Sequence, residues 1–113
     1  MPPIPTSAPS QTDFLASFGA APVEAVPEDG FWAYEFDGPS GTRVRLSYNT
    51  HDGSVQTACL IEDRLLAVMV CEGAKSIRIG EDERIHVAFS CQAGMALTIT
   101  VFPVASVEWA SMR

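Results

Sequence analysis

Long apolar segments, basic residues and histidine are all scarce in this sequence of 113 residues. The longest nearly uncharged apolar stretch, Leu65 to Cys71, is far shorter than the roughly 20 residues that a membrane-spanning helix needs. The N-terminal residues MPPIPTSAPS contain no basic residue and no apolar block of the length that a secretory signal requires. We therefore expect a cytoplasmic protein that has no membrane partner.

Basic residues are outnumbered by acidic ones, with seven Lys and Arg against fourteen Asp and Glu and a net charge of −7. This balance repels a phosphate backbone unless the few bases are concentrated, so nucleic acid is not expected as a partner. An acidic face can instead steer the approach of a basic protein. The charge therefore favours a protein partner.

The three cysteines do not form a recognisable framework. Cys59, Cys71 and Cys91 cannot all pair within one chain, and none of them lies in a CxxC or CxxH spacing. Each sits in an apolar run that is typical of a strand, which is the usual setting of a buried free thiol. We predict free thiols in a reducing compartment rather than a disulfide.

Residues that could carry catalysis are isolated from one another. His51 and His86, the only histidines, fall on different predicted elements without a partner at metal-ligand spacing. Ser90 shares a strand face with His86, but four residues at about 3.3 Å each separate them by roughly 13 Å, too far for proton transfer. The sequence contains no GxSxG, phosphate-loop, HExxH or EF-hand pattern. It predicts no catalytic site, no metal site and no cofactor, and hence a protein that is not an enzyme.

The composition and the N-terminal pattern predict one domain that begins with a helix. Hydrophobic residues make up 47% of the chain and charged residues 19%, as expected for one packed core. Residues 1–10 are rich in proline and are expected to form a flexible tail, with a single β-rich domain over 11–113. Ser10 and Asp13 fit a capping box, Phe14 and Phe18 share a helical face, and Gly19 offers a stop, which predicts a helix over 11–18. Residues 20–30 are expected to be an irregular connection.

From Phe31 onward the hydrophobic period is two, which is typical of strands. Connections of about two to five residues force neighbouring strands to be antiparallel. The fold class is therefore mainly β (α+β): one short N-terminal helix, then an antiparallel meander of seven or eight strands in a curved sheet, a sandwich or an open barrel. Residues 65–71 are apolar on both faces, a pattern typical of a central strand. The predicted strands cover residues 31–36, 44–48, 55–61, 65–71, 77–79, 85–89, 95–101 and 107–109.

Several segments together resemble small bacterial proteins of the polymorphic-toxin immunity type. They are DFLASFGAAPV, GFWAYEF, TRVRLSY and VQTACLIEDRLLAVMVCEGAKSIRI, and the resemblance extends over residues 12 to 110. It lies in size, acidity, a leading helix with FG, and the β-meander that follows. It implies a non-catalytic protein that neutralises a cognate toxin, with the acidic turns as contacts for a basic domain such as a nuclease.

Arg43 and Arg45 also project side by side from one strand, where they could hold a carboxylate of a partner. The candidate partner-binding residues are Glu62, Asp63, Glu81, Asp82, Glu83, Arg43 and Arg45.

Two other functions are compatible with the same residues. One is a small-ligand-binding barrel or sandwich, with a pocket built from aromatic residues of the strands. The other is a structural subunit that self-associates through an open sheet edge, for instance as a homodimer, which Lys75 and Arg78 would discourage. The residues of the proposed aromatic pocket are Trp32, Tyr34, Phe36 and Phe89.

Overall fold

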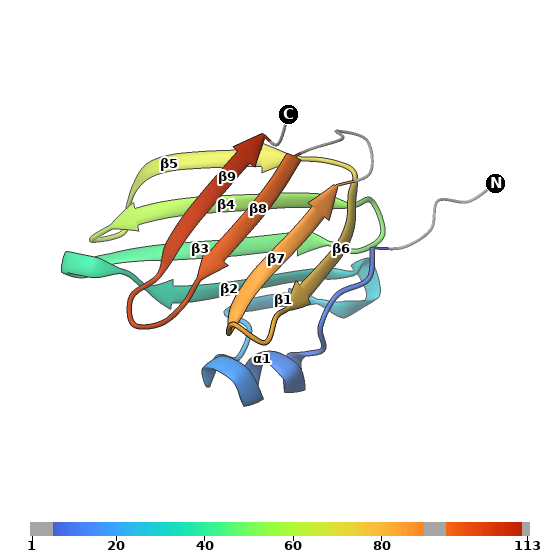
Figure 1. Ribbon diagram of the computed structural model, residues 1–113, viewed down its shortest axis with the longest axis horizontal. Coiled ribbons are helices and arrows are strands. Elements are labelled where there is room, and N and C mark those ends of the chain that lie inside the picture. The colour runs from blue at the N-terminus through green and yellow to red at the C-terminus, as the bar shows by residue number, and fades with distance from the viewer. Residues whose placement is uncertain (1–5, 90–94, 112–113) are drawn as a thin grey trace.

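The computed structural model describes residues 6–89 and 95–111 of the chain (Figure 1). This part contains one α-helix, two short 3-10 helices and nine β-strands. The elements in chain order are α1 (Gln11–Phe18), β1 (Glu24–Val26), η1 (Pro27–Asp29), β2 (Phe31–Asp37), η2 (Pro39–Gly41), β3 (Thr42–Asn49), β4 (Ser54–Ile61), β5 (Arg64–Cys71), β6 (Ala74–Ile79), β7 (Arg84–Phe89), β8 (Met95–Thr100) and β9 (Ser106–Ser111).

The helix begins and ends where the sequence predicts. The Ser10 side chain accepts a hydrogen bond from the Asp13 backbone N–H, and the Asp13 side chain accepts one from the Ser10 backbone, which completes the capping box. Gly19 ends the helix in the left-handed conformation, with φ of 66°, which a residue without Cβ adopts at little cost. Phe14 and Phe18 are buried on the inner face of α1, as expected.

The strands form two antiparallel sheets in sequential order, β1-β2-β3-β4-β5 and β6-β7-β8-β9. Figure 1 shows the second sheet lying obliquely across the first, so the fold is a two-layer sandwich rather than one closed sheet. The mainly β class and the antiparallel meander are thereby confirmed. The chain passes from one sheet to the other between β5 and β6.

One strand lies where an irregular connection was predicted. β1 pairs with β2 at three positions, with Glu24 opposite Ala33 and Val26 opposite Phe31. The prediction for residues 20–30 was wrong at β1 because three residues between two prolines give almost no period to detect. Their extended conformation comes from pairing with β2 rather than from local preference.

Aromatic side chains of α1 and β2 fill one side of the core between the sheets. Phe14 stacks on Tyr34 with ring centroids 3.9 Å apart, and Phe18 meets the edge of Phe36 at 5.8 Å. Burial raises the pKa of the Tyr34 phenol above its ordinary value, so this hydroxyl stays neutral. Two residues of the predicted aromatic ligand pocket, Tyr34 and Phe36, are therefore packing partners of the helix.

The other two residues of that predicted pocket also pack against neighbouring side chains. Phe89 stacks on Trp109 of β9, with centroids 5.8 Å apart. Trp32 is half-buried and packs against the same hydrophobic cluster.

The strand β5 is at an edge, so its predicted central position was wrong. It ends the five-stranded sheet, and its large apolar side chains are 42 to 60% exposed. Trp109 of β9, in the second sheet, contacts β4 of the first sheet, where its Nε1–H donates a hydrogen bond of 2.9 Å to the Thr57 Oγ1. Within β5, Cys71 alone is buried. The exposed residues are Leu65, Leu66, Val68, Met69 and Val70.

The edge formed by β6 is partly covered by the chain's own N-terminal segment. Ser7 forms a parallel bridge with Ser76, and the Ile77 N–H donates to the Ser7 carbonyl over 2.7 Å. The Thr6 hydroxyl also donates to the Ala74 carbonyl over 2.7 Å. Residues 1–5 of the predicted flexible tail lie outside the described residues.

We predict that Phe14→Ala lowers the free energy of unfolding by about 3 to 5 kcal/mol, because it removes a fully buried ring and leaves a cavity beside Tyr34. Urea denaturation measures the change. The neighbouring Leu15 is 56% exposed on the same helix, so Leu15→Ala serves as the control and should change stability by no more than about 0.5 kcal/mol. Equal effects of the two substitutions would contradict the role of Phe14 in the core.

Candidate partner-binding surfaces

The outer face of the five-stranded sheet carries a cluster of ion pairs around two arginines. In the register of β2 and β3, Glu35 lies opposite Arg45. The Glu35 carboxylate receives Arg43 Nη1 at 3.1 Å and Arg45 Nη1 at 3.3 Å. Arg45 Nη2 also contacts the Glu24 carboxylate at 3.1 Å, and Arg43 pairs with Asp63. We call these five residues the arginine cluster.

The ion pairs of the arginine cluster limit the ability of Arg43 and Arg45 to bind a carboxylate of a partner. Their side chains are 34% and 28% exposed, and each already contacts two carboxylates. A partner's carboxylate would have to compete with these internal ones, so Arg43 and Arg45 are better placed to hold the Asp63 turn than to receive an acidic loop. Exposed pairs of this kind contribute little stability individually, at most about 1 kcal/mol.

Two members of the cluster, Glu24 and Glu35, were not predicted from the sequence. A signal for Glu35 was present, since a hairpin through the turn DGPSG places β2 residues opposite β3 residues. Glu24 gave no such signal because its strand was itself not predicted.

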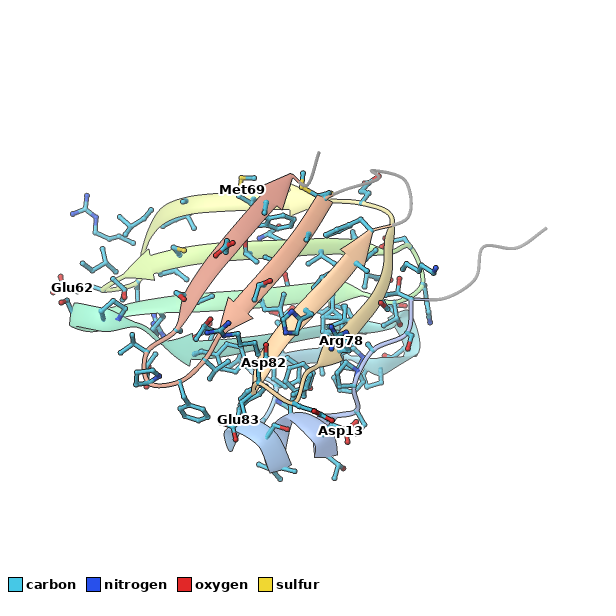
Figure 2. All side chains as sticks on the ribbon, in the orientation of Figure 1. Asp13, Glu62, Met69, Arg78, Asp82 and Glu83 are labelled. Carbon is cyan, nitrogen blue, oxygen red and sulfur yellow. The ribbon has the colours of Figure 1, made fainter. Side chains whose placement is uncertain are left out.

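The acidic turns lie on two different hairpins. Glu62 and Asp63 form the tip between β4 and β5, whereas Glu81, Asp82 and Glu83 lie between β6 and β7. Figure 2 shows Glu62 at one end of the first sheet, and Asp82 and Glu83 beside α1 at the lower edge of the second. The structure therefore presents two separate acidic projections rather than one patch.

The β4–β5 turn is conformationally costly for its residues. Glu62 and Asp63 have φ of 48° and 65°, in the left-handed region that two-residue hairpin turns need. Asn-Gly or Asp-Gly is the usual choice there, because a glutamate Cβ is disfavoured at positive φ. Two consecutive carboxylates occupy this turn in spite of that local preference.

The turn between β6 and β7 contains a carboxylate paired with histidine. His86 Nε2 lies 3.0 Å from Asp82 Oδ2, and the Arg84 backbone N–H donates to Asp82 Oδ1 over 3.1 Å. The hydrogen bond from the His86 imidazole is the main cause that lowers the pKa of the Asp82 carboxyl below its ordinary value. Across the sheet, His86 lies between Arg78 of β6 and Thr98 of β8.

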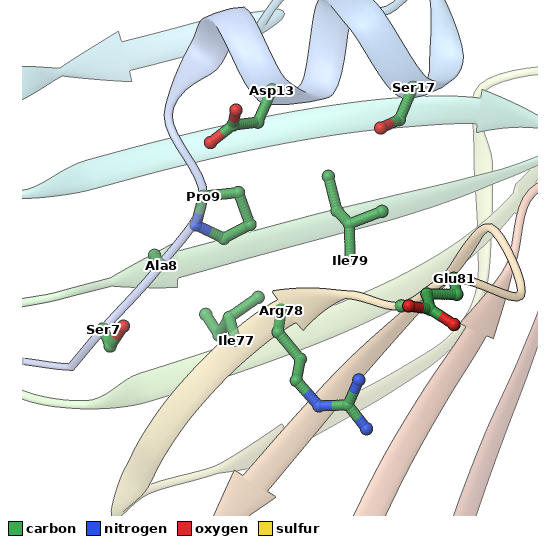
Figure 3. A pocket seen from close by; sticks show the side chains of 10 residues that line it. Ser7, Ala8, Pro9, Asp13, Ser17, Ile77, Arg78, Ile79 and Glu81 are labelled. Carbon is green, nitrogen blue, oxygen red and sulfur yellow. The ribbon is translucent and has the colours of Figure 1, made fainter.

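A shallow hollow of about 440 Å³ separates the N-terminal segment and α1 from β6. Figure 3 shows Asp13 and Ser17 entering it from the helix, with Arg78 and Glu81 on the opposite side. It is wide and open to solvent, so Glu81 of the second acidic turn is accessible from this side.

The residues considered for chemistry remain dispersed in the described part of the chain. Cys59 and Cys71 are free thiols, whereas Ser90 and Cys91 lie outside the described residues. Within residues 6–89 and 95–111, no three His, Cys, Asp or Glu side chains are grouped to hold a metal ion. The described residues also contain no helix with the length and apolarity needed to cross a membrane.

Comparison with known proteins identifies a relative in fold. Neither a protein-family model nor a curated protein matches this sequence. A chain from a solved structure does match, and that structure is described as "Contact-dependent growth inhibition toxin - immunity protein complex from Klebsiella pneumoniae 342". The TM-score is 0.76 at 16% sequence identity, over 96% of this chain and 98% of that chain. The two chains share a fold. The resemblance that the sequence suggested is thus confirmed at the level of architecture.

We predict that the Asp82 carboxyl titrates below the ordinary aspartate range and that His86→Ala returns its pKa toward that range. Because folding lowers this pKa, the ionised carboxylate stabilises the folded state above the unfolded-state pKa, and this contribution is lost as the pH falls through the lowered value. Carboxyl carbon shifts followed by NMR against pH measure both titrations.

Asp52 is the internal control for this titration. Hydrogen bonds from the Ser54 backbone and hydroxyl lower its pKa on a different hairpin, so it should titrate equally low in both proteins. An Asp82 pKa that stays low in His86→Ala would show that the imidazole is not its cause.

Proposed function

We propose that this chain is an immunity-type protein that binds a cognate bacterial toxin domain and neutralises it. The observation that carries the proposal is the structural likeness to a chain from a toxin–immunity complex, with almost complete coverage of both chains. A match of that extent concerns the whole domain rather than a recurring fragment such as one hairpin. Because a fold can host many functions, the proposal also depends on surfaces of this chain.

The surface feature of this chain that supports the proposal is its charge. The chain carries a net charge of −7, and its acidic turns project from two hairpins where solvent and a partner can reach them. Glu62 and Asp63 occupy a turn conformation that favours other residues, so placing these two carboxylates there has a local conformational cost. A basic toxin domain, such as one that acts on nucleic acid, is the partner whose charge would complement these turns.

In this function the chain acts by binding alone. Its side chains would cover the toxin's active site or block access of the substrate, which requires no catalytic group, metal or cofactor in this chain. The neutralised toxin and this chain would meet in the cytoplasm of the producing cell, where the toxin would otherwise act.

We predict that a toxin domain encoded beside the gene of this chain arrests growth when expressed alone and that coexpression of this chain restores growth. The purified proteins should form a stable complex with a dissociation constant of about 10 nM or tighter, which is within the range of specific protein complexes. Growth curves and isothermal titration calorimetry measure the two outcomes.

A toxin domain from an unrelated system is the control, and this chain should neither bind it nor protect against it. The proposed function would be wrong if the adjacent toxin remained fully active and unbound in the presence of this chain.

We predict that the acidic turns accelerate association with the toxin. Glu62→Gln/Asp63→Asn and Glu81→Gln/Glu83→Gln each remove two negative charges, and each should lower the association rate about tenfold at low salt. The difference should shrink as salt screens the charges. Asp82 is left intact so that its contact with His86 is preserved, and Glu62→Gln alone is measured beside the first variant because Asp63→Asn also removes the ion pair with Arg43. Stopped-flow binding at several ionic strengths provides the measurement.

Glu28→Gln/Asp29→Asn is the matched control, since it removes the same charge from the exposed 3-10 helix η1. It should lower the rate less than either turn variant does. If all three variants behaved alike, only net charge would matter, and the turns would not be contacts even though neutralisation itself could persist.

A further inference from the structure

The edge of β2 that faces away from β3 has a gap in its backbone hydrogen bonds. At one end of the gap, the Val23 N–H donates to the Ala33 carbonyl over 2.8 Å. At the other end, the Ala105 N–H donates to the Asp37 carbonyl over 3.0 Å. Alternate residues of a strand direct their backbone groups to the same edge, so the N–H and C=O of Glu35 face the gap. Within residues 6–89 and 95–111, no backbone group bonds to either of them.

A hollow of about 390 Å³ lies along this gap. The end of α1 with the residues after it (18–21) forms one wall, and the chain after β8 (101–103) forms another, beside the end of β2 (Figure 1). Phe18 meets the edge of Phe36 at 5.8 Å, and Phe102 lies 6.1 Å from Phe18 between ring centroids. Phe102 is 52% exposed. The hollow therefore presents an aromatic surface to solvent.

The charge at this hollow is negative. Its charged lining residues are Glu35 and Asp37, and no described lysine, arginine or histidine lines it. Glu35 is neutralised by its pairs with Arg43 and Arg45. Asp37 is exposed and forms no ion pair within the described ranges, since Arg43 opposite it contacts Glu35 and Asp63 instead. The Asp37 carboxylate is therefore the charge that remains without a partner.

The hollow beside β6 does not select a ligand in this way. Arg78 lines it together with Asp13 and Glu81, so charges of both signs face the same space. The hollow at β2 combines one uncompensated carboxylate, one unpaired backbone carbonyl and an exposed aromatic ring. Each of these three groups attracts a cation.

We propose that the hollow at β2 receives an arginine side chain of the toxin domain, an inference that rests on the proposed function. A guanidinium carries five N–H donors and a flat face that stacks on aromatic rings. Glu35 and Asp37 direct their side chains to the outer face of the sheet, whereas Phe36 faces the core. A long side chain that enters along the strand edge therefore meets the Glu35 carbonyl, the Asp37 carboxylate and the ring of Phe102 together.

The site is tested first with the full chain alone, by following its backbone amide shifts in NMR titrations with N-acetyl-arginine amide. Shifts should concentrate at Glu35, Asp37 and Phe102 and saturate in the millimolar range, as expected for one side chain without its protein. N-acetyl-citrulline amide is the matched control probe, because it has nearly the same shape without the charge. It should leave these amides unchanged.

Four variants locate the binding within the hollow. Asp37→Asn and Phe102→Leu should each weaken binding of the arginine probe at least about threefold, since the first removes the charge and the second the aromatic face. Asp29→Asn removes the same charge from η1, and Val104→Ala shortens another exposed apolar side chain near Phe102 that does not line the hollow. Both should bind the probe as the wild type does. Thermal unfolding of each variant identifies any loss of fold.

The same variants are then measured against the toxin domain encoded beside the gene of this chain. Asp37→Asn and Phe102→Leu should each raise the dissociation constant at least about tenfold, mainly through faster dissociation, as expected for a buried arginine contact. Asp29→Asn and Val104→Ala should change it less than about twofold. An alanine scan of the toxin's arginines should find one whose loss adds nothing to Asp37→Asn, which identifies the side chain in the hollow.

Two results would overturn this inference alone. One is an arginine probe that shifts exposed carboxylates throughout the chain, or no more than its citrulline control does. The other is a toxin complex that forms tightly and protects growth while remaining indifferent to Asp37→Asn and Phe102→Leu. A wild-type chain that binds no toxin would instead overturn the proposed function, and this inference with it.

Discussion

The other features of this fold depend on how much of the five-stranded sheet is covered by the four-stranded sheet. One core serves both layers, and α1 closes it on the β2 side through the contacts of Phe14 and Phe18. On the opposite side Trp109 of β9 reaches β4 through its hydrogen bond to Thr57, and β5 contributes only Cys71 to the core. The other seven residues of β5 are exposed. The described fold therefore buries the rings of α1 and β2 that meet between the sheets but leaves most of β5 exposed.

Charge is distributed in accordance with this arrangement. The arginine cluster spans β1, β2, β3 and the β4–β5 turn on the outer face, where its contacts bind neighbouring elements to one another. Carboxylates without such partners project from turns, and Glu62 and Glu83 occupy positive φ there. The outer face therefore uses its charges internally, whereas Glu62, Glu81 and Glu83 of the turns offer theirs to a partner. This division favours approach by a basic protein at the hairpin tips over recognition by the flat face.

Much of the fold follows from local sequence, and the exceptions have physical reasons. The capping residues Ser10 and Asp13 are close in sequence, so the helix could be predicted to the residue. The two-residue period likewise located the main strands. The position of β5 could not be predicted from its sequence. A run that is apolar on both faces is typical of a central strand, but it does not show where the strand lies in the sheet. Glu35 was missed although the DGPSG hairpin placed β2 opposite β3, because its role depends on the exact strand register and not on its neighbours in sequence.

The hairpin of β4 and β5 joins an acidic tip to an exposed apolar strand. Its tip carries Glu62 and Asp63, and its second strand is the apolar edge. The ion pair with Arg43 ties Asp63 of that tip to the outer face of the sheet, so the carboxylate of Glu62 is the charge that the tip leaves for a partner. A basic domain that approached Glu62 would also meet the exposed apolar side chains of β5, which begins two residues later. The tip would attract such a domain by charge, whereas the adjoining strand offers it apolar area to bury.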